Sequence, residues 1–132
     1  MGIKSDPICG LSDITAAVAG KISELGFKHG NVTIFIAGST GGVTTMEYEP
    51  GLIQDLPGLF EKLIPSSKSY HHDQTWGDGN GFSHLRAALL GASLTIPFEN
   101  GKLLLGTWQQ IVVVNFDNRS RNREIILQFI GT

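Results

Sequence analysis

The sequence predicts an α+β fold, a single domain built mainly as an antiparallel β-sheet or sandwich with about three helices. Short β-branched segments bounded by glycines or turn residues alternate with a few segments of helical spacing, and the strand-like segments concentrate in the second half of the chain. The chain has 132 residues, of which 41% are hydrophobic and 17% charged. This composition fits one globular domain over residues 1–132 that buries its own core.

The apolar residues recur at helical spacing in three segments. We expect helices over about residues 16–25, 50–64 and 83–90. Asp13 or Thr15 could cap the first helix, which Gly26 would end, and Gly91 would end the third. Pro57 predicts a kink in the second helix, or a later start, because an interior proline removes a helical hydrogen bond. The third helix is expected to turn three side chains inward: Leu85, Ala88 and Leu89.

The remaining ordered segments have the pattern of β-strands. We expect strands over residues 32–37, 43–47, 93–98, 102–105, 108–116 and 124–130. Asn100-Gly101 is a strong hairpin signal between two of them. Residues 66–82 are polar and rich in glycine, and we expect them to be irregular. Because Ile111–Val114 is apolar on both faces, its second face needs cover from helices or from another subunit.

Composition also limits the partners of the protein. The formal net charge of -2 argues against a general nucleic-acid binder, which needs a basic surface. No stretch of the chain approaches the length of a membrane-spanning segment, and no secretory signal is evident at the N-terminus. The single cysteine, Cys9, cannot form an internal disulfide, which suits a reducing cytoplasm. We therefore expect a cytoplasmic protein without nucleic-acid or membrane partners.

The segment from Tyr70 to His84 holds the largest group of side chains that could bind a ligand or take part in a reaction. It holds three of the four histidines, with His71 expected to point away. His72 could swing beside His84 on a glycine-rich loop, and Asp78 or Asp73 would complete a His/His/carboxylate set suited to a divalent transition metal such as zinc. A solvated polar loop is the competing interpretation, and spacing alone favours it because two histidines twelve residues apart match no metal motif.

Three other groups could take part in a site. Ser39 and Thr40, within the loop Gly38–Gly42, could hold a phosphate group, although a tight turn between strands explains that loop equally well. Arg119, Arg121 and Arg123 would lie at the turn of the hairpin that joins the last two strands, either as an anion clamp or as solvated side chains. Glu47, at the end of a strand, could be a base or a solvated carboxylate.

Several motifs together resemble the YjbQ-like (UPF0047) family. The resemblance spans about residue 11 to the end of the chain. Its motifs are Leu89-Leu90-Gly91-Ala92-Ser93-Leu94-Thr95-Ile96-Pro97, Asn100-Gly101-Lys102-Leu103, Leu105-Gly106-Thr107-Trp108-Gln109, Tyr70-x-His72, Asn80-x-x-x-His84-Leu85 and Arg119-x-Arg121 with Gly131. It implies an antiparallel α+β fold and a homotrimer with sites near subunit contacts, which would explain the doubly apolar strand.

The resemblance also implies an activity, although it leaves open whether this chain is an enzyme. Some members of the family are described as weak thiamine-phosphate synthases, transferases that join an aminopyrimidine diphosphate to a thiazole phosphate and release pyrophosphate. His72 and His84 match the site histidines of the family, Asp78 and Asn80 match its loop positions, and Glu47 and Arg121 match further site positions. A non-catalytic trimeric module that binds a metal or a phosphorylated metabolite is the alternative.

The chain departs from the family pattern at two places. Many members carry a histidine just before the threonine of the first loop, where this chain has Ser39 before Thr40. A third histidine ligand is therefore missing. The N-terminal strand of the family is also shortened, because only residues 1–10 are available for it. Both departures bear on whether metal binding and activity are retained.

Overall fold

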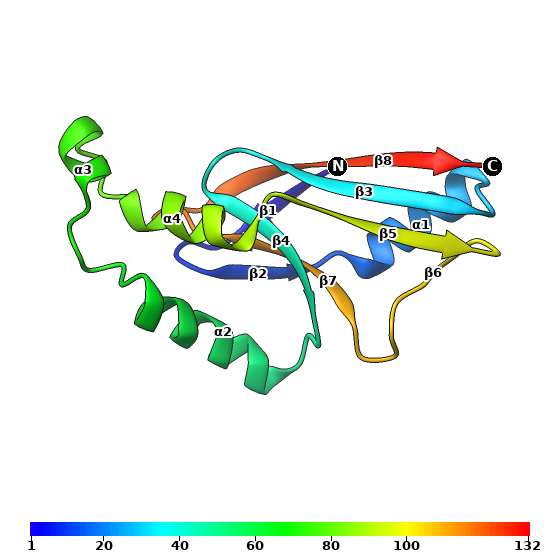
Figure 1. The fold of residues 1–132 in the computed structure, drawn as a ribbon, viewed down its shortest axis with the longest axis horizontal. Coiled ribbons are helices and arrows are strands. Elements are labelled where there is room, and N and C mark those ends of the chain that lie inside the picture. The colour runs from blue at the N-terminus through cyan, green and yellow to red at the C-terminus, as the bar shows by residue number, and fades with distance from the viewer.

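The computed structural model describes residues 1–132 as four helices and eight strands (Figure 1). The strands are β1 (Gly2–Ser5), β2 (Gly10–Asp13), β3 (Gly30–Ala37), β4 (Gly41–Met46), β5 (Ser93–Glu99), β6 (Lys102–Leu103), β7 (Gln110–Asn115) and β8 (Arg121–Gly131). The helices are α1 (Thr15–Leu25), α2 (Pro50–Leu63), α3 (His71–Trp76) and α4 (Gly81–Leu90). The α+β prediction is confirmed, with one more helix than expected.

The strands form two antiparallel sheets. The five-stranded sheet has the order β1-β8-β3-β5-β6, and the three-stranded sheet has the order β2-β7-β4. The predicted hairpin between β5 and β6 is present, and both turn residues, Asn100 and Gly101, have the positive φ angles of 52° and 75° that an Asn-Gly turn needs. The long pairing of β3 with β8 fixes the centre of the larger sheet.

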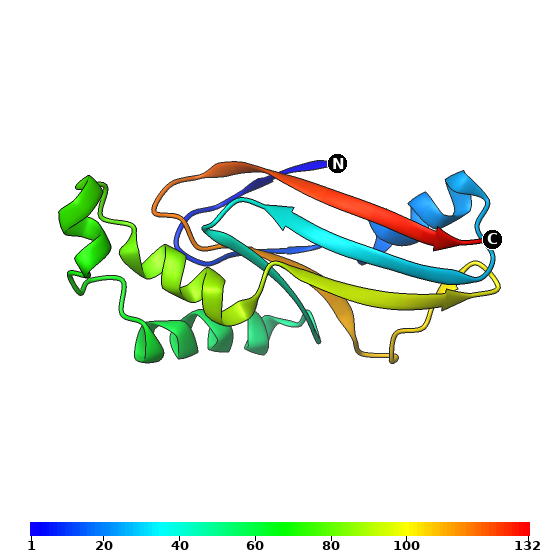
Figure 2. The same ribbon diagram turned by 45° about the horizontal axis from the view of Figure 1, so that its top comes forward.

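The main core lies between the two sheets, and α1 closes one end of it (Figure 2). Alternate residues of β3 point into this core, where Val32, Ile34 and Ile36 are fully buried. From α1 come Val18 and Ile22, one helical turn apart. Gly26 ends that helix in the left-handed conformation, as predicted.

Strand β7 is buried on both faces within a single chain. Ile111 and Val113 belong to the core between the sheets, whereas Val112 and Val114 belong to a second cluster on the opposite face. Phe60 of α2 and Ala87 of α4 complete that second cluster. Helices therefore cover the second face of β7, and the expectation that a subunit contact would explain this doubly apolar strand is wrong.

Helix α4 faces inward with different residues from those predicted. Leu85, Ala88 and Leu89 are exposed, whereas Phe82, Ser83, Arg86 and Ala87 are buried. The prediction was wrong because it put Leu85 and Leu89 on the core side by their apolar character. The Arg86 guanidinium occupies that side instead. It donates to the carbonyls of Ile64 and Ile8 and pairs with Glu61 at 2.9 Å.

Two further predictions need correction. Residues 66–82 are not irregular throughout, because His71–Trp76 forms α3, closed by Gly77 in the left-handed conformation. Helix α2 begins at Pro50 and continues through Pro57, so the later start is wrong. Its N-terminal N–H groups are satisfied by the Glu49 carboxylate, at 2.9 Å from Gly51 and 2.6 Å from Leu52. The short N-terminal segment still supplies β1, paired with β8.

The last two long strands do not form the predicted hairpin. Strand β7 belongs to the three-stranded sheet and β8 to the five-stranded sheet, so the segment between them crosses from one sheet to the other. Phe116 and Asp117, at the start of this crossing, are buried. The arginines beyond it are therefore not a row on a solvated ribbon: Arg121 is half-buried and Arg123 is buried.

None of the four helices has the length and apolar character that crossing a lipid bilayer requires.

Arg86 connects α4 to the end of α2, and its removal should destabilise the fold. We expect Arg86→Ala to lower the free energy of unfolding by about 2–4 kcal/mol, because buried carbonyl groups lose their donors and a cavity opens. Urea unfolding checks this value. Lys62→Ala, an exposed basic residue on α2, should change the free energy by less than about 0.5 kcal/mol. Equal effects of the two substitutions would contradict the assigned role of Arg86.

Candidate anion and metal site

A polar pocket of about 470 Å³ lies where the β3–β4 loop, the start of α4 and the start of β8 meet. Its lining residues are Ala37, Gly38, Ser39, Thr40, Asp78, Asn80, His84, Arg121, Asn122, Arg123 and Glu124. A hollow of about 350 Å³ adjoins it, shares Gly38, Ser39 and His84, and is otherwise lined by small residues such as Ala88 and Ala92. A larger hollow of about 690 Å³ beside α1 contains no histidine or carboxylate, so the candidate chemistry lies in the smaller pocket.

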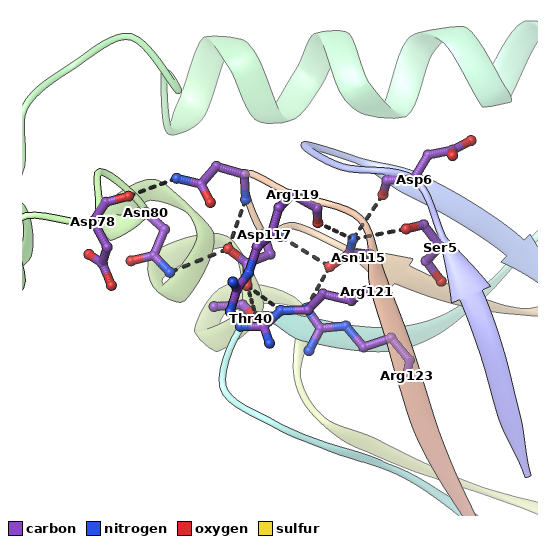
Figure 3. Close-up of polar contacts among 11 residues, drawn as sticks. Ser5, Asp6, Thr40, Asp78, Asn80, Asn115, Asp117, Arg119, Arg121 and Arg123 are labelled. Carbon is purple, nitrogen blue, oxygen red and sulfur yellow. Dashed lines mark hydrogen bonds and ion pairs between the residues drawn. The ribbon is translucent and has the colours of Figure 1, made fainter.

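The floor of this pocket is a buried hydrogen-bond network around Asp117 (Figure 3). The Asp117 carboxylate accepts from Arg121 Nε at 2.7 Å, from Thr40 Oγ1 at 3.3 Å and from the backbone N–H of Asn118 at 2.8 Å. Burial alone would raise the pKa of Asp117, but hydrogen bonds from Arg121, Asn118 and Asn80 hold it below its usual value. Asp117 is therefore a permanent negative charge that fixes the Arg121 side chain.

Arg123 is the least compensated charge of the network. Its side chain donates to Thr40 Oγ1 at 2.7 Å and to Asn115 Oδ1. Only 5% of the residue is exposed, its Nε has no partner, and it forms no ion pair with a carboxylate. Burial, followed by the neighbouring Arg121 charge, lowers its pKa, whereas the Asp117 charge acts in the opposite direction. An anion in the pocket would further favour the cationic form.

The β3–β4 loop approaches this guanidinium because it carries glycines. Gly38 has φ of +127°, which side chains rarely adopt, and a Cβ there would lie 3.0 Å from Arg123 Nη1. A Cβ at Gly41 would lie 3.2 Å from the Arg123 Cζ. The glycine-rich loop is thus both a turn between the two sheets and a wall of the pocket, and it leaves the Ser39 hydroxyl exposed at the rim.

His72 and His84 come together, as predicted for a flexible loop that folds back. Their ring centroids lie 4.3 Å apart. His72 Nδ1 is buried without a hydrogen-bond partner, and Asp78 Oδ1 lies 3.7 Å from it. Burial, followed by the neighbouring His72, lowers the pKa of His84, whereas Asp78 and Asp117 act in the opposite direction. His84 is therefore held as a neutral imidazole, the form that accepts a proton or binds a metal.

These groups are suited to a divalent cation. One ligand atom from each of His72, Asp73 and Asp78 lies within 4.8 Å of the others. Asp73 is the least free of the three, because its oxygens accept from the backbone N–H groups of Tyr70 at 2.9 Å and Gly81 at 2.8 Å. The unpartnered His72 nitrogen beside a carboxylate is the observation that fits a metal, and His84 could supply a further nitrogen.

The structure separates the predicted site residues into two groups. The pocket brings together Ser39, Thr40, Asp78, His84 and Arg121, with His72 packed against His84. Two predicted residues lie elsewhere. The Arg119 side chain is exposed and does not line the pocket, and its carbonyl accepts from Asn115. Glu47 follows β4 at the end opposite the pocket and is exposed.

The sequence reasoning missed Asn115 and Asp117, and it expected Arg123 at an exposed turn, as part of an anion clamp, and not as a buried side chain. One signal was present in the sequence. Asn115-Phe116-Asp117 places two polar residues directly after a fully apolar strand, a position that often carries binding groups. The other signal, the crossing between two sheets, is a property of the fold that no local pattern contains.

The fold and the pocket define a small α+β protein of two antiparallel sheets with a pocket lined by histidine and arginine. Comparison with protein families gives the class a name. Residues 2–132 match the family model described as "UPF0047 protein YjbQ-like". The chain therefore belongs to the YjbQ-like UPF0047 family, and the resemblance inferred from its motifs is confirmed.

Relatives and solved structures agree with this assignment. A UPF0047 protein of Methanothermobacter thermautotrophicus is 39% identical over 121 residues, covering 92% of this chain and 82% of the relative. A UPF0047 protein of Archaeoglobus fulgidus is 40% identical over 99 residues, covering 75% and 77%. The crystal structure of a YbjQ-like protein of unknown function from Sulfolobus solfataricus superposes with a TM-score of 0.91 at 33% identity, covering 100% of this chain and 96% of that one.

The environment of His84 predicts how its titration responds to its neighbours. In metal-free protein we expect His84 to titrate below 6.5, its ordinary value. Asp78→Asn should lower its pKa further, because a negative charge that favours the imidazolium is lost, whereas His72→Ala should raise it. NMR titration of the ring protons with a chelator present measures both shifts. Asp55→Asn, an exposed carboxylate on α2, serves as the control. If neither substitution moved the His84 pKa, the assigned contacts would be wrong.

Proposed function

We propose that the polar pocket binds a small phosphorylated metabolite. One observation carries this proposal: Arg123 is buried, forms no ion pair and lines the pocket. A buried cation without a direct ion-pair partner is costly, and a bound phosphate would compensate it. The 470 Å³ pocket has room for such a ligand.

The surrounding groups suit a tetrahedral anion. Asp117 holds Arg121 through Nε, and the terminal nitrogens of Arg121 form no hydrogen bond within the chain. They would therefore donate to the phosphate oxygens, as guanidinium groups commonly do. The Ser39 hydroxyl lies at the rim of the same pocket, and the Thr40 hydroxyl lies between Asp117 and Arg123. The part of the metabolite without charge would extend toward the adjoining hollow lined by Ala88 and Ala92.

We further propose a divalent cation, zinc or a similar ion, at His72, Asp78 and His84. The unpartnered His72 Nδ1 beside Asp78 supports this assignment. When bound, the cation would neutralise negative charge on phosphate or diphosphate oxygens at the histidine end of the pocket. Asp78 and Glu124 both line the pocket and would repel an anionic ligand, so a cation at Asp78 would also reduce that repulsion.

The reaction we propose to test first is of the thiamine-phosphate synthase type. It joins an aminopyrimidine diphosphate to a thiazole phosphate and releases pyrophosphate, so the leaving group needs positive charge around it. Arg121 and Arg123 would supply that charge, and neutral His84 would accept or return a proton. Formation of thiamine phosphate by the purified protein, lost in Arg121→Gln, would support this reaction. Glu47 lies too far along β4 to take part within one chain.

A non-catalytic trimeric module is the second candidate. The outer face of the five-stranded sheet exposes apolar side chains: Phe35, Ile126 and Ile130. Such a face is suited to contact between copies of this chain. The serine before Thr40, where many relatives carry a histidine, favours binding without catalysis. Ligand binding without turnover, together with a trimer in sedimentation equilibrium, would support this candidate. The lone Cys9 favours a cytoplasmic location for either function.

The anion proposal predicts a specific effect at Arg121. Arg121→Gln should weaken binding of inorganic phosphate about tenfold, because a charge-assisted hydrogen bond is lost. Isothermal titration calorimetry of metal-free protein measures the dissociation constants. Arg119→Gln removes the same charge from the same segment but outside the pocket, and it should change the affinity by less than about twofold. Equal losses in both variants would show a diffuse charge effect and would contradict the pocket.

The metal proposal predicts binding of about one zinc ion per chain. His72→Ala should weaken this binding strongly, and the double variant His72→Ala/His84→Ala should abolish it. Metal analysis after dialysis of untagged protein measures the zinc content. His71→Ala, an exposed neighbour on the same helix, should keep the full content. Zinc retained in the double variant would place the metal elsewhere.

A further inference from the structure

Asn80 lies between two carboxylates, Asp78 and Asp117 (Figure 3). Its Nδ2 lies 3.3 Å from Asp117 Oδ1. The other end of the amide faces Asp78, and a nitrogen at that end would lie 2.9 Å and 3.2 Å from the two Asp78 oxygens. Asn80 is 7% exposed, so water cannot readily replace either contact. The two ends of one buried amide therefore meet two negatively charged groups.

An amide carries one NH₂ group and one oxygen, so it can donate to only one of these carboxylates. The other carboxylate must face the amide oxygen, and two such acceptors repel each other unless a proton or a cation lies between them. Between Asn80 and Asp117 we expect neither a proton nor a cation. Hydrogen bonds from Arg121 and Asn118 keep that carboxylate ionised despite its burial, and its Oδ2 already accepts from both Arg121 and Thr40.

At Asp78 a cation can be accommodated. The Asp78 carboxylate is about half exposed and lies 3.7 Å from the unpartnered His72 Nδ1. With a cation there, the Asn80 oxygen would be a further ligand beside the Asp78 carboxylate and the histidine nitrogens, and the NH₂ group would point to Asp117. Without a cation, the shorter contacts to Asp78 favour the reversed amide, which turns its oxygen against Asp117.

We propose that the Asn80 side chain couples cation binding at His72 and Asp78 to anion binding at Arg121 and Arg123. The inference rests on the proposed function, because it assumes both ligands. A bound cation orients the amide oxygen toward Asp78 and the NH₂ toward Asp117. Asp117 then gains a donor and loses a repulsive contact, so it holds Arg121 and Thr40 more firmly in place for the anion.

The connection from Asn80 to the anion runs through a chain of hydrogen bonds. Asp117 Oδ2 binds Arg121 Nε at 2.7 Å and Thr40 Oγ1 at 3.3 Å, and Thr40 in turn accepts from Arg123 at 2.7 Å. Arg121 is therefore two hydrogen bonds from Asn80, and Arg123 is three. Coupling of this kind is reciprocal, so the anion must also strengthen cation binding by the same factor.

Two titrations measure the coupling in the full chain. Sulfate, a tetrahedral dianion that does not precipitate zinc, is titrated into the protein with and without saturating zinc. Zinc is titrated with and without saturating sulfate. In the native protein we expect zinc to tighten sulfate binding by about fivefold or more, and sulfate to tighten zinc binding by the same factor.

Asn80→Asp is the diagnostic variant. Its side chain can still ligate a cation, but it cannot donate to Asp117 when both are ionised. We expect zinc binding to persist while the coupling factor falls to about twofold or less. The coupling that remains would come from the direct attraction between the zinc and sulfate ions. Asn122→Asp adds the same charge to the lining of the pocket without touching either carboxylate. It should weaken sulfate binding but keep the coupling factor of the native protein.

The outcomes separate this inference from the proposed function. A coupling factor equal in native protein and Asn80→Asp would overturn the role of Asn80 and leave both ligand sites standing. Absence of coupling in the native protein would also overturn the role of Asn80 and leave both ligand sites standing. Failure to bind sulfate without zinc, at any concentration tested, would overturn the anion pocket itself. Failure to bind zinc would overturn the metal site, and the coupling with it.

Discussion

The buried Asp117 carboxylate is the constraint on which the site depends. It lies where the chain crosses from the three-stranded to the five-stranded sheet, and its donors come from the β3–β4 loop, the crossing itself and the start of β8. A buried carboxylate is tolerated only when such donors surround it. Satisfying Asp117 therefore holds three segments together, and the same donors build the floor of the pocket. The pocket is consequently a property of how the two sheets meet and not of one flexible loop.

The packing of β7 explains why helices bring the histidines to this point. Because both faces of β7 are apolar, α2 and α4 must cover the face that the five-stranded sheet does not. Arg86 fixes α4 in that position through the carbonyls of Ile64 and Ile8. The N-terminus of α4 then lies beside the end of β7, which places Asn80 and His84 next to Asp117. The histidine site is thus positioned by the packing that completes the core.

Local patterns in the sequence contained most of the strands but only part of the site. Alternating β-branched residues and the Asn100-Gly101 turn are local signals, and the structure has strands at each predicted place. The inward face of α4 was mistaken because a buried arginine looks like a solvated one until its carbonyl partners are known. Asp117 was not recognised, and the burial of Arg123 was not foreseen, because both depend on a crossing between sheets. The proximity of His72 and His84 was expected, but only the structure shows the unpartnered nitrogen between them and Asp78.

The distribution of charge in the pocket determines how an anionic ligand would lie in it. Arg121 and Arg123 line one side, where Asp117 neutralises only one of the two positive charges. Asp78 lines the other side, beside His84. Without a cation at Asp78, a phosphate on that side would meet a carboxylate, whereas at the arginine side it would complete the charge balance. The phosphate would therefore lie against Arg123 and Thr40, and the rest of the ligand would point past His84 into the hollow lined by Ala88 and Ala92. That orientation would bring the rest of the ligand beside His84, the imidazole that lines the pocket and whose pKa burial lowers.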